Sequence, residues 1–215
     1  FDKGSYVKIL PSERRIIGYT TRNSGGVSSN FRNYFVLEFS RSFTSGYTWN
    51  GTVPDKNALE MQADHAGAIV GFKTVKGEKI GVKVASSFIS MEQAEQNLRS
   101  ELGNASFSQV VAASKKAWNE VLGKVQVQGG SEEQRRTFYS CLYRTVCFPQ
   151  KHYEITKGGE MVHYSPYNGK VLPGYLYAGT GFWDTFRALY PLLNLLYPSV
   201  NREMQAGLIN DYLEG

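Results

Sequence analysis

Hydrophobic and polar residues alternate in short runs through the first part of the chain, up to Phe88. The runs with this two-residue period cover residues 6–10, 14–22, 33–43, 58–63, 67–74 and 79–88. Turn-forming residues separate several of them, as in Asn23-Ser24-Gly25-Gly26, Asn50-Gly51 and Lys76-Gly77-Glu78. Short strands without helices between them are typical of two packed antiparallel sheets. We therefore expect a β-sandwich here, or part of one.

The period becomes helical after Ser90. A Ser followed three residues later by Gln is a capping-box pattern that starts helices, and it occurs at Ser90, Ser106 and Ser131. It predicts three successive helices, over residues 91–102, 107–122 and 132–148. The second of these carries apolar residues at the i, i+3, i+4 spacing of a buried helix face.

Residues 149–181 are rich in Gly, Pro and Tyr and show no period. We expect a long ordered loop here, with a hairpin across residues 157–160. Loops of this length within folded domains usually carry function. A fourth helix is predicted from Phe182 or Trp183 to Tyr197, and a fifth is predicted to be capped by Ser199.

Composition and charge narrow the function classes. The chain has 215 residues, of which 41% are hydrophobic and 20% charged, which is typical of a globular protein. Its formal charge is +5, but Lys and Arg are scattered, so we expect no nucleic-acid partner. No apolar run reaches 18 residues, so we expect no membrane span.

The candidate chemistry lies where the fourth helix begins. There Trp183, Asp184 and Arg187 fall within five residues. A sugar ring stacks on an aromatic plate while its hydroxyls bind charged partners, so this grouping fits a sugar site. A structural alternative is that Asp184 caps the helix and pairs with Arg187 three residues later.

Longer segments strengthen the first interpretation. They are Tyr164-Ser165-Pro166-Tyr167-Asn168-Gly169-Lys170-Val171-Leu172-Pro173-Gly174-Tyr175 and Gly181-Phe182-Trp183-Asp184-Thr185-Phe186-Arg187-Ala188. Upstream are Tyr34-Phe35-Val36-Leu37-Glu38-Phe39-Ser40, the segment from Val82 to Ala94, Ala117-Trp118-Asn119 and Phe138-Tyr139-Ser140-Cys141-Leu142-Tyr143-Arg144. In this order they resemble glycoside hydrolase family 92, the bacterial exo-acting α-mannosidases.

The resemblance implies a multi-domain β plus α architecture. Residues 1–88 would be the C-terminal part of an antiparallel β-sandwich domain, and residues 89–129 a helical linker. Residues 130–215 would then be the start of an (α/α)6 catalytic barrel.

The resemblance also implies an activity. Family members release terminal mannose with inversion, and we expect this protein to act on N-glycans or mannans, with α-1,2 as the expected linkage. Inversion needs two carboxyl groups about 6.5–9.5 Å apart, one as general acid and one as general base. The family also binds Ca²⁺ at the sugar. The resemblance implies that these carboxylates and the calcium ligands lie beyond Gly215, so we expect no catalytic residue and no metal ligand within this chain, and no activity from it alone.

Five residues are candidate contacts to a mannose-containing oligosaccharide. The resemblance implies that Asp184 accepts hydrogen bonds from sugar hydroxyls, beside Trp183 and Arg187. His163 and Tyr164, in the preceding loop, would rim the pocket. Such a substrate implies the periplasm, the cell surface or secretion from a bacterium.

Two other function classes remain open from the residues. One is a carbohydrate-binding protein without catalysis, because the chain has a sugar-site motif and no defensible acid–base pair. The other is a different (α/α)6 glycosidase.

Overall fold

The computed structural model describes residues 4–51 and 53–215. These residues form two units, each with its own core. The first unit contains the chain up to Asn104 together with Glu154–Glu160 and Tyr164–Val171. The second contains Ala105–Tyr153, Met161–His163 and Leu172–Gly215.

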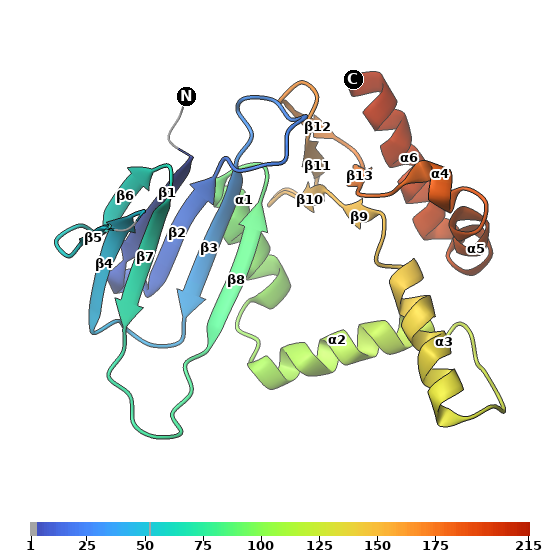
Figure 1. Ribbon diagram of the computed structural model, residues 1–215, viewed down its shortest axis with the longest axis horizontal. Helices are drawn as coiled ribbons and strands as arrows, with labels where there is room; N and C mark the ends of the chain where they lie inside the picture. The colour runs from blue at the N-terminus through green and yellow to red at the C-terminus, as the bar shows by residue number, and fades with distance from the viewer. Residues whose placement is uncertain (1–3, 52) are drawn as a thin grey trace. The chain divides into compact units, whose positions relative to one another are not determined.

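Two antiparallel sheets make up most of the first unit (Figure 1). The larger has the order β6-β1-β2-β3-β8, with β6 at Glu60–Ala63, β1 at Ser5–Leu10, β2 at Arg15–Thr20, β3 at Asn33–Phe39 and β8 at Val82–Ser87. The smaller has the order β5-β4-β7, with β5 at Val53–Asp55, β4 at Ser45–Asn50 and β7 at Ala66–Gly71.

The alternation of β1 and β2 directs one apolar set into the space between the sheets. Ile9, Ile16 and Phe39 are buried there and pack against side chains that include Val70 of β7. Because side chains alternate across a strand, their neighbours point to the opposite face. The expected alternation therefore produces a shared core between two sheets.

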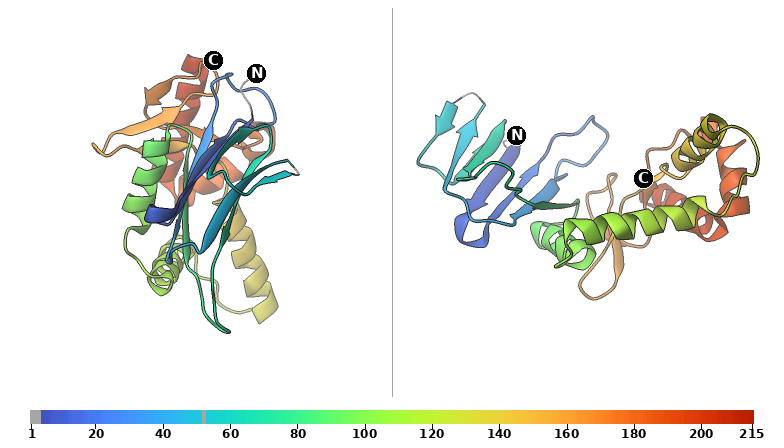
Figure 2. Two further views of the ribbon diagram at one scale, coloured as in Figure 1. Left: turned by 90° about the vertical axis from the view of Figure 1, so that its left-hand side faces the viewer. Right: turned by 90° about the horizontal axis from the view of Figure 1, so that it is seen from below.

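The opposite face of the larger sheet is covered by helix α1 (Met91–Asn97), drawn in green in two views (Figure 1, Figure 2). Val36 is fully buried against Ala94 and Leu98 of this helical segment. The helix continues into a π-helical turn at Leu98–Leu102, so the helix predicted over residues 91–102 is present with a change of geometry in its second half. The Ser90 side chain accepts a hydrogen bond from the Gln93 backbone N–H, as its capping pattern predicts.

A buried polar network joins α1 to a segment much later in the chain. Asn97 donates to the Glu154 carboxylate at 2.7 Å, and Gln93 donates to the Ile155 carbonyl at 2.8 Å. The Phe88 N–H also donates to Glu154, at 2.9 Å. These bonds place residues 154–160 within the first unit although they follow two helices of the second.

The sequence prediction missed β4 and β5. Their residues, 45–50 and 53–55, were left between predicted strands. Glycine and polar residues interrupt the alternation there, as at Gly46. The pairing of Trp49 with Gly67 fixes β4, and this is a contact that the local pattern does not reveal.

Helices dominate the second unit. They are α2 (Phe107–Leu122), α3 (Glu132–Thr145), α4 (Phe182–Thr185), α5 (Leu189–Leu196) and α6 (Pro198–Glu214). Complete capping boxes begin α2 and α3, at Ser106 and Ser131, as predicted. Within the described chain no side chain of α2 is fully buried, and Phe107 is 85% exposed. The apolar stripe therefore forms but is covered only in part, where Val121 packs against the core of the second unit.

The predicted fourth helix is broken in two, and the prediction of a continuous helix from residue 182 to 197 was wrong. The chain turns after α4 and restarts as α5 at Leu189. Pro191 explains the break. It has no N–H to bond the Arg187 carbonyl, and its ring would collide with that carbonyl in a continuous helix. Proline is tolerated in the first turn of a new helix, where no partner is needed.

The predicted cap of the fifth helix was also wrong. Helix α6 begins at Pro198, whose fixed φ suits the first helical position. No side-chain hydrogen bond caps the start of this helix. Ser199 lies inside its first turn and is not the N-cap.

The loop predicted over residues 149–181 contains five short strands: β9 (Gln150–Lys151), β10 (Tyr153–Ile155), β11 (Met161–Tyr164), β12 (Val171–Pro173) and β13 (Tyr177–Ala178). Strands β10, β11 and β12 pair in that order, and β13 pairs with β9. The predicted hairpin is confirmed, because the Thr156 N–H donates to the Glu160 carbonyl at 2.9 Å.

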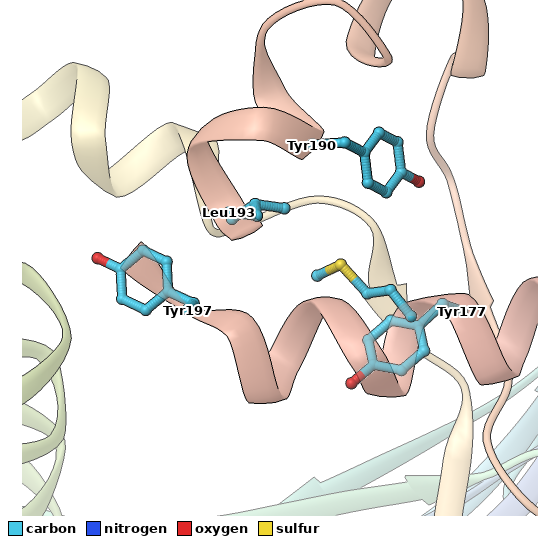
Figure 3. Close-up of a cluster of buried hydrophobic side chains, with 5 residues drawn as sticks. Tyr177, Tyr190, Leu193 and Tyr197 are labelled. Carbon is cyan, nitrogen blue, oxygen red and sulfur yellow. The ribbon is translucent and has the colours of Figure 1, made fainter. Parts of the chain in front are cut away.

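Tyrosines dominate the core of the second unit (Figure 3). Its buried members are Tyr177, Tyr190, Leu193, Tyr197 and Met204. The Tyr197 hydroxyl donates to the Val121 carbonyl at 2.9 Å, which ties the end of α5 to the end of α2. In the part of the chain that the structure describes, no helix is long and apolar enough to cross a membrane.

Candidate functional site

The residues predicted to bind sugar are carried by the single turn of α4. Gly181 precedes it, and the Gly181 carbonyl accepts from the Asp184 N–H at 3.1 Å and from the Thr185 hydroxyl at 2.9 Å. The Phe182 ring stacks on Phe186 at 6.1 Å and contacts Tyr190 at 5.7 Å. The turn is therefore held to α5 by aromatic packing on one side.

The Asp184 carboxylate is exposed, and within the described residues it has neither a hydrogen-bond partner nor an ion-pair partner. It folds back over Gly181, so a Cβ at that position would lie 2.8 Å from Asp184 Oδ2. Glycine therefore leaves room for the carboxylate in this position. An exposed carboxylate beside an aromatic ring is free to accept hydrogen bonds from a ligand.

Arg187 stacks on aromatic rings. Its guanidinium lies 4.9 Å from the centre of the Trp183 ring and 5.1 Å from that of Phe186. Trp183 itself is 72% exposed. The structural alternative, in which Asp184 caps the helix and pairs with Arg187, is not found among the described residues, since α4 has no side-chain cap. Trp183, Asp184 and Arg187 therefore form one exposed group with an aromatic, an anionic and a cationic member.

His163 is fully buried in the second unit. Its Nδ1 lies 3.0 Å from the Gly174 carbonyl, and its Nε2 lies 2.9 Å from the Glu214 carboxylate. A carbonyl oxygen only accepts, so Nδ1 carries a proton. Both ring nitrogens are therefore occupied by the protein, and the role of His163 as a sugar contact stays a prediction.

Tyr164 belongs to the first unit and is 8% exposed. Its hydroxyl donates to Asn30 Oδ1 at 3.0 Å, and its ring meets Phe31 edge to face at 5.9 Å. Burial raises the pKa of the Tyr164 phenol. Its sugar contact also stays a prediction, and the partners that it has belong to a loop 134 residues earlier.

One feature that the sequence prediction missed lies beside the tyrosine core. The Glu203 carboxylate of α6 accepts from the Tyr177 hydroxyl at 2.9 Å and from the Tyr153 hydroxyl at 3.4 Å. Burial and then the bond to Glu203 raise the pKa of Tyr177. The spacing of Tyr153, Tyr175 and Tyr177 in the aperiodic loop was the available signal, but their acidic partner is too distant in sequence to predict.

The described residues contain no group of three His, Cys, Asp or Glu side chains that could hold a metal ion. Calcium takes six to eight oxygen ligands, mostly from carboxylates and carbonyls. The described side chains therefore supply no cluster of such ligands, whereas the resemblance implies calcium ligands beyond Gly215.

Comparison with known proteins covers nearly the whole chain. Residues 2–87 match the glycosyl hydrolase family 92 N-terminal domain, and residues 93–215 match the glycosyl hydrolase family 92 catalytic domain. A curated relative from Arthroderma benhamiae, named as an uncharacterized secreted glycosidase, is 33% identical over 121 residues, which are 54% of this chain and 14% of that protein.

Solved structures agree. An inverting family 92 mannosidase from Bacteroides thetaiotaomicron is 44% identical over all of this chain and 29% of its own, with a TM-score of 0.96. A family 92 α-mannosidase from the same organism, solved with mannoimidazole, is 23% identical over 28% of its length, with a TM-score of 0.87, and shares the fold.

The chain thus spans less than a third of these solved relatives. Its antiparallel sheets followed by helices match the corresponding part of their structures. The matches to both family domains show that this chain belongs to glycoside hydrolase family 92.

Proposed function

We propose that this chain supplies scaffold and substrate-binding residues to an inverting exo-α-mannosidase that releases terminal mannose, α-1,2-linked, from N-glycans or mannans. The observation that carries the proposal is the free carboxylate of Asp184 beside the exposed Trp183 ring and Arg187. Binding sites for sugars combine an aromatic wall with a few polar groups, and this turn offers both.

Each member of the group has a role in the proposal. Asp184 accepts hydrogen bonds from mannose hydroxyls, which are stronger than neutral bonds because the acceptor is ionised. Trp183 stacks on the apolar face of the ring. Arg187, stacked on Trp183, holds that ring in place and directs its remaining N–H groups to the ligand. His163 and Tyr164 are retained as candidate contacts.

The domain assignment is part of the same proposal. Residues 1–88 are the later part of a β-sandwich, residues 89–129 a linker, and residues 130–215 the start of an (α/α)6 barrel. Because the chain spans 29% of the solved inverting mannosidase, the general acid, the general base and the calcium ligands are proposed to come from the rest of the catalytic domain. The proposed location is the periplasm, the cell surface or the medium, and the name of the Arthroderma benhamiae relative, a secreted glycosidase, supports secretion.

The test is replacement of Asp184 by Asn in the full-length protein. Losing a charged hydrogen-bond partner of the substrate costs about 2–5 kcal/mol, so we expect kcat/KM on α-mannosides to fall about 30-fold or more. Glu133→Gln is the matched control, since Glu133 is also an exposed carboxylate in the first turn of a helix. Unchanged kcat/KM in Asp184→Asn would refute the assignment, as would an equal loss in the control.

A carbohydrate-binding protein without catalysis is the second candidate, because Trp183, Asp184 and Arg187 group an exposed ring with two charged side chains, as a sugar-binding site requires. Hydrolysis of α-mannosides by the full-length wild type decides between the two. Mannose binding without turnover would favour the second candidate.

A further inference from the structure

One face of α6 combines polar side chains with a glycine at helical spacing. Glu203, Gly207, Asn210 and Glu214 follow one another at intervals of three or four residues, so they lie on the same side of the helix. All four are buried or half-buried, whereas Gln205 on the same helix is exposed. We call these four residues the α6 stripe.

The segment Gly174–Tyr177, which leads into β13, lies along the α6 stripe. Asn210 Nδ2 donates to the Tyr175 carbonyl at 2.8 Å, and the Glu203 carboxylate accepts from the Tyr177 hydroxyl at 2.9 Å. The stripe therefore holds this segment at two points, one on its backbone and one on a side chain.

A third link to the stripe runs through His163. Its Nε2 lies 2.9 Å from the Glu214 carboxylate, and its Nδ1 lies 3.0 Å from the Gly174 carbonyl. The Leu176 carbonyl accepts from the His152 N–H at 2.9 Å. Three successive carbonyls of the segment are thus bonded, so its backbone has little freedom to shift.

Two glycines allow the segment and the helix to approach closely. A Cβ at Gly207 would lie 3.1 Å from the Tyr177 backbone nitrogen, and a Cβ at Gly174 would lie 2.8 Å from Asn210 Nδ2. Gly174 also has a φ of +104°, which side chains other than hydrogen disfavour. The segment therefore packs directly on α6, and the Tyr177 ring lies across the helix (Figure 3).

The same segment leads to the group on α4. Only residues 179–181 separate β13 from α4, the turn that carries Asp184. A second connection runs through the core, because Phe182 contacts Tyr190 at 5.7 Å and Tyr190 is buried in one cluster with Tyr177. A displacement of Tyr177 would therefore reach α4 both along the chain and through the core.

We propose that Glu203 and Asn210 are positioning residues for the group on α4. They hold Gly174–Tyr177 against α6, and this fixes the place of Trp183 and Asp184. The inference rests on the proposed function, in which these two side chains bind the sugar. A misplacement of about 1 Å can lower the rate of an enzyme about 100-fold, so partial loosening of α4 should be measurable.

The first experiment measures KM and kcat of the full-length protein on an α-mannoside. Asn210→Ala should raise KM about tenfold and leave kcat within about twofold, because a loosened α4 weakens substrate binding. A merely structural role would instead lower the amount of folded enzyme, and so lower kcat at an unchanged KM. Gln205→Ala, which removes an exposed amide from the same helix, is the matched control and should change neither constant.

Glu203 is tested by a conservative replacement. Glu203→Gln keeps an oxygen that accepts from the Tyr177 hydroxyl and should keep KM within about twofold, whereas Glu203→Ala should raise it about tenfold. If Asn210→Ala does not fold, Asn210→Ser removes the same Nδ2 donor with a smaller loss of polarity.

Hydrogen–deuterium exchange gives a readout that needs no substrate. The Asp184 and Thr185 N–H groups both bond to the Gly181 carbonyl at 3.1 Å. Asn210→Ala should speed their exchange about tenfold, and Gln205→Ala should leave it unchanged. Unchanged exchange in Asn210→Ala, or faster exchange with an unchanged KM, would overturn the proposal. If the wild type hydrolyses no α-mannoside, the proposed function fails, and exchange alone decides whether the α6 stripe fixes α4.

Discussion

In the first unit the apolar side chains of β1 and β2 are buried between two sheets, whereas in the second unit the apolar stripe of α2 is at most half-buried and its first residue, Phe107, is exposed. Ile9 is 2% exposed, while Phe107 is 85% exposed. The same contrast holds for polar groups. Glu154 and its partners in the first unit are enclosed by hydrogen bonds, whereas Asp184 in the second has no protein partner within the described residues.

The contrast indicates that the residues that stabilise the fold are different from those that we propose to bind a ligand. Burial of apolar side chains is the main source of folding free energy, and the first unit holds it in two clusters that share one sheet. Large exposed apolar groups mark surfaces that contact something else. The exposed ring of Trp183 on α4, which we propose for ligand binding, is such a group. Helix α4 packs on the tyrosine core through Phe182 and Tyr190.

The largest expected effect tests where stability resides. Replacing Ile9 by Ala should lower the free energy of unfolding by about 3–4 kcal/mol, because the cavity left between two sheets cannot collapse fully. Urea denaturation measures it. Ile69→Ala on β7 is the matched control, since Ile69 is 42% exposed and should lose less than about 1 kcal/mol. Equal losses in the free energy of unfolding for the two variants would contradict the prediction that the buried position contributes more to stability.

A smaller effect is expected in the tyrosine core. Tyr177→Phe removes a hydrogen bond to the Glu203 carboxylate and should cost about 2 kcal/mol in the free energy of unfolding at neutral pH.

The pH dependence of stability sharpens this prediction. The unfolded chain releases the Tyr177 proton near pH 10, whereas the folded chain, in which the pKa of Tyr177 is raised, retains it to higher pH. The folded state then binds more protons, so wild-type stability should fall as the pH rises above about 10. Thermal unfolding measured across this pH range should show that stability falls less steeply in Tyr177→Phe than in wild type. Tyr212→Phe should keep the wild-type pH profile, because the Tyr212 side chain is 85% exposed. Identical pH profiles for wild type and Tyr177→Phe would contradict the assignment.

The smallest effect on folding is expected at the proposed site. Trp183→Ala should change the free energy of unfolding by less than about 0.5 kcal/mol, because the ring is 72% exposed. It should nevertheless raise KM for α-mannosides about tenfold by removing the stacking surface. Phe182→Ala is the comparison: its ring packs on Phe186 and Tyr190, so it should cost stability. A large loss of stability in Trp183→Ala would mean that the ring is structural.

Local patterns predicted much of the fold and little of the packing. Alternation found β1 and β3, and the capping boxes located the starts of α2 and α3, because these signals depend on neighbours in sequence. They did not show that the stripe of α2 would be covered only in part. Burial depends on which surfaces meet, and a helical period reports only that one face is apolar.

The candidate site shows the same limit. The short motif was enough to place Trp183 and Asp184 together, but it did not reveal that Arg187 would stack on aromatic rings. His163 and Tyr164 find their partners 51 and 134 residues away, at Glu214 and Asn30. No spacing rule reaches so far, and only the folded chain shows that both side chains are enclosed.

The hydrogen bonds from Asn97 to Glu154 and from Asn30 to Gly169 limit where two related proteins can be joined into a chimera. The two family domains meet near residue 90 along the chain, yet residues 154–160 and 164–171, from the catalytic-domain sequence, belong to the unit built by the N-terminal one. A chimera joined at residue 90 would therefore combine Asn30 from one parent with Gly169 from another. We therefore expect such a chimera to fold well only where both members of each hydrogen-bonded pair come from the same parent.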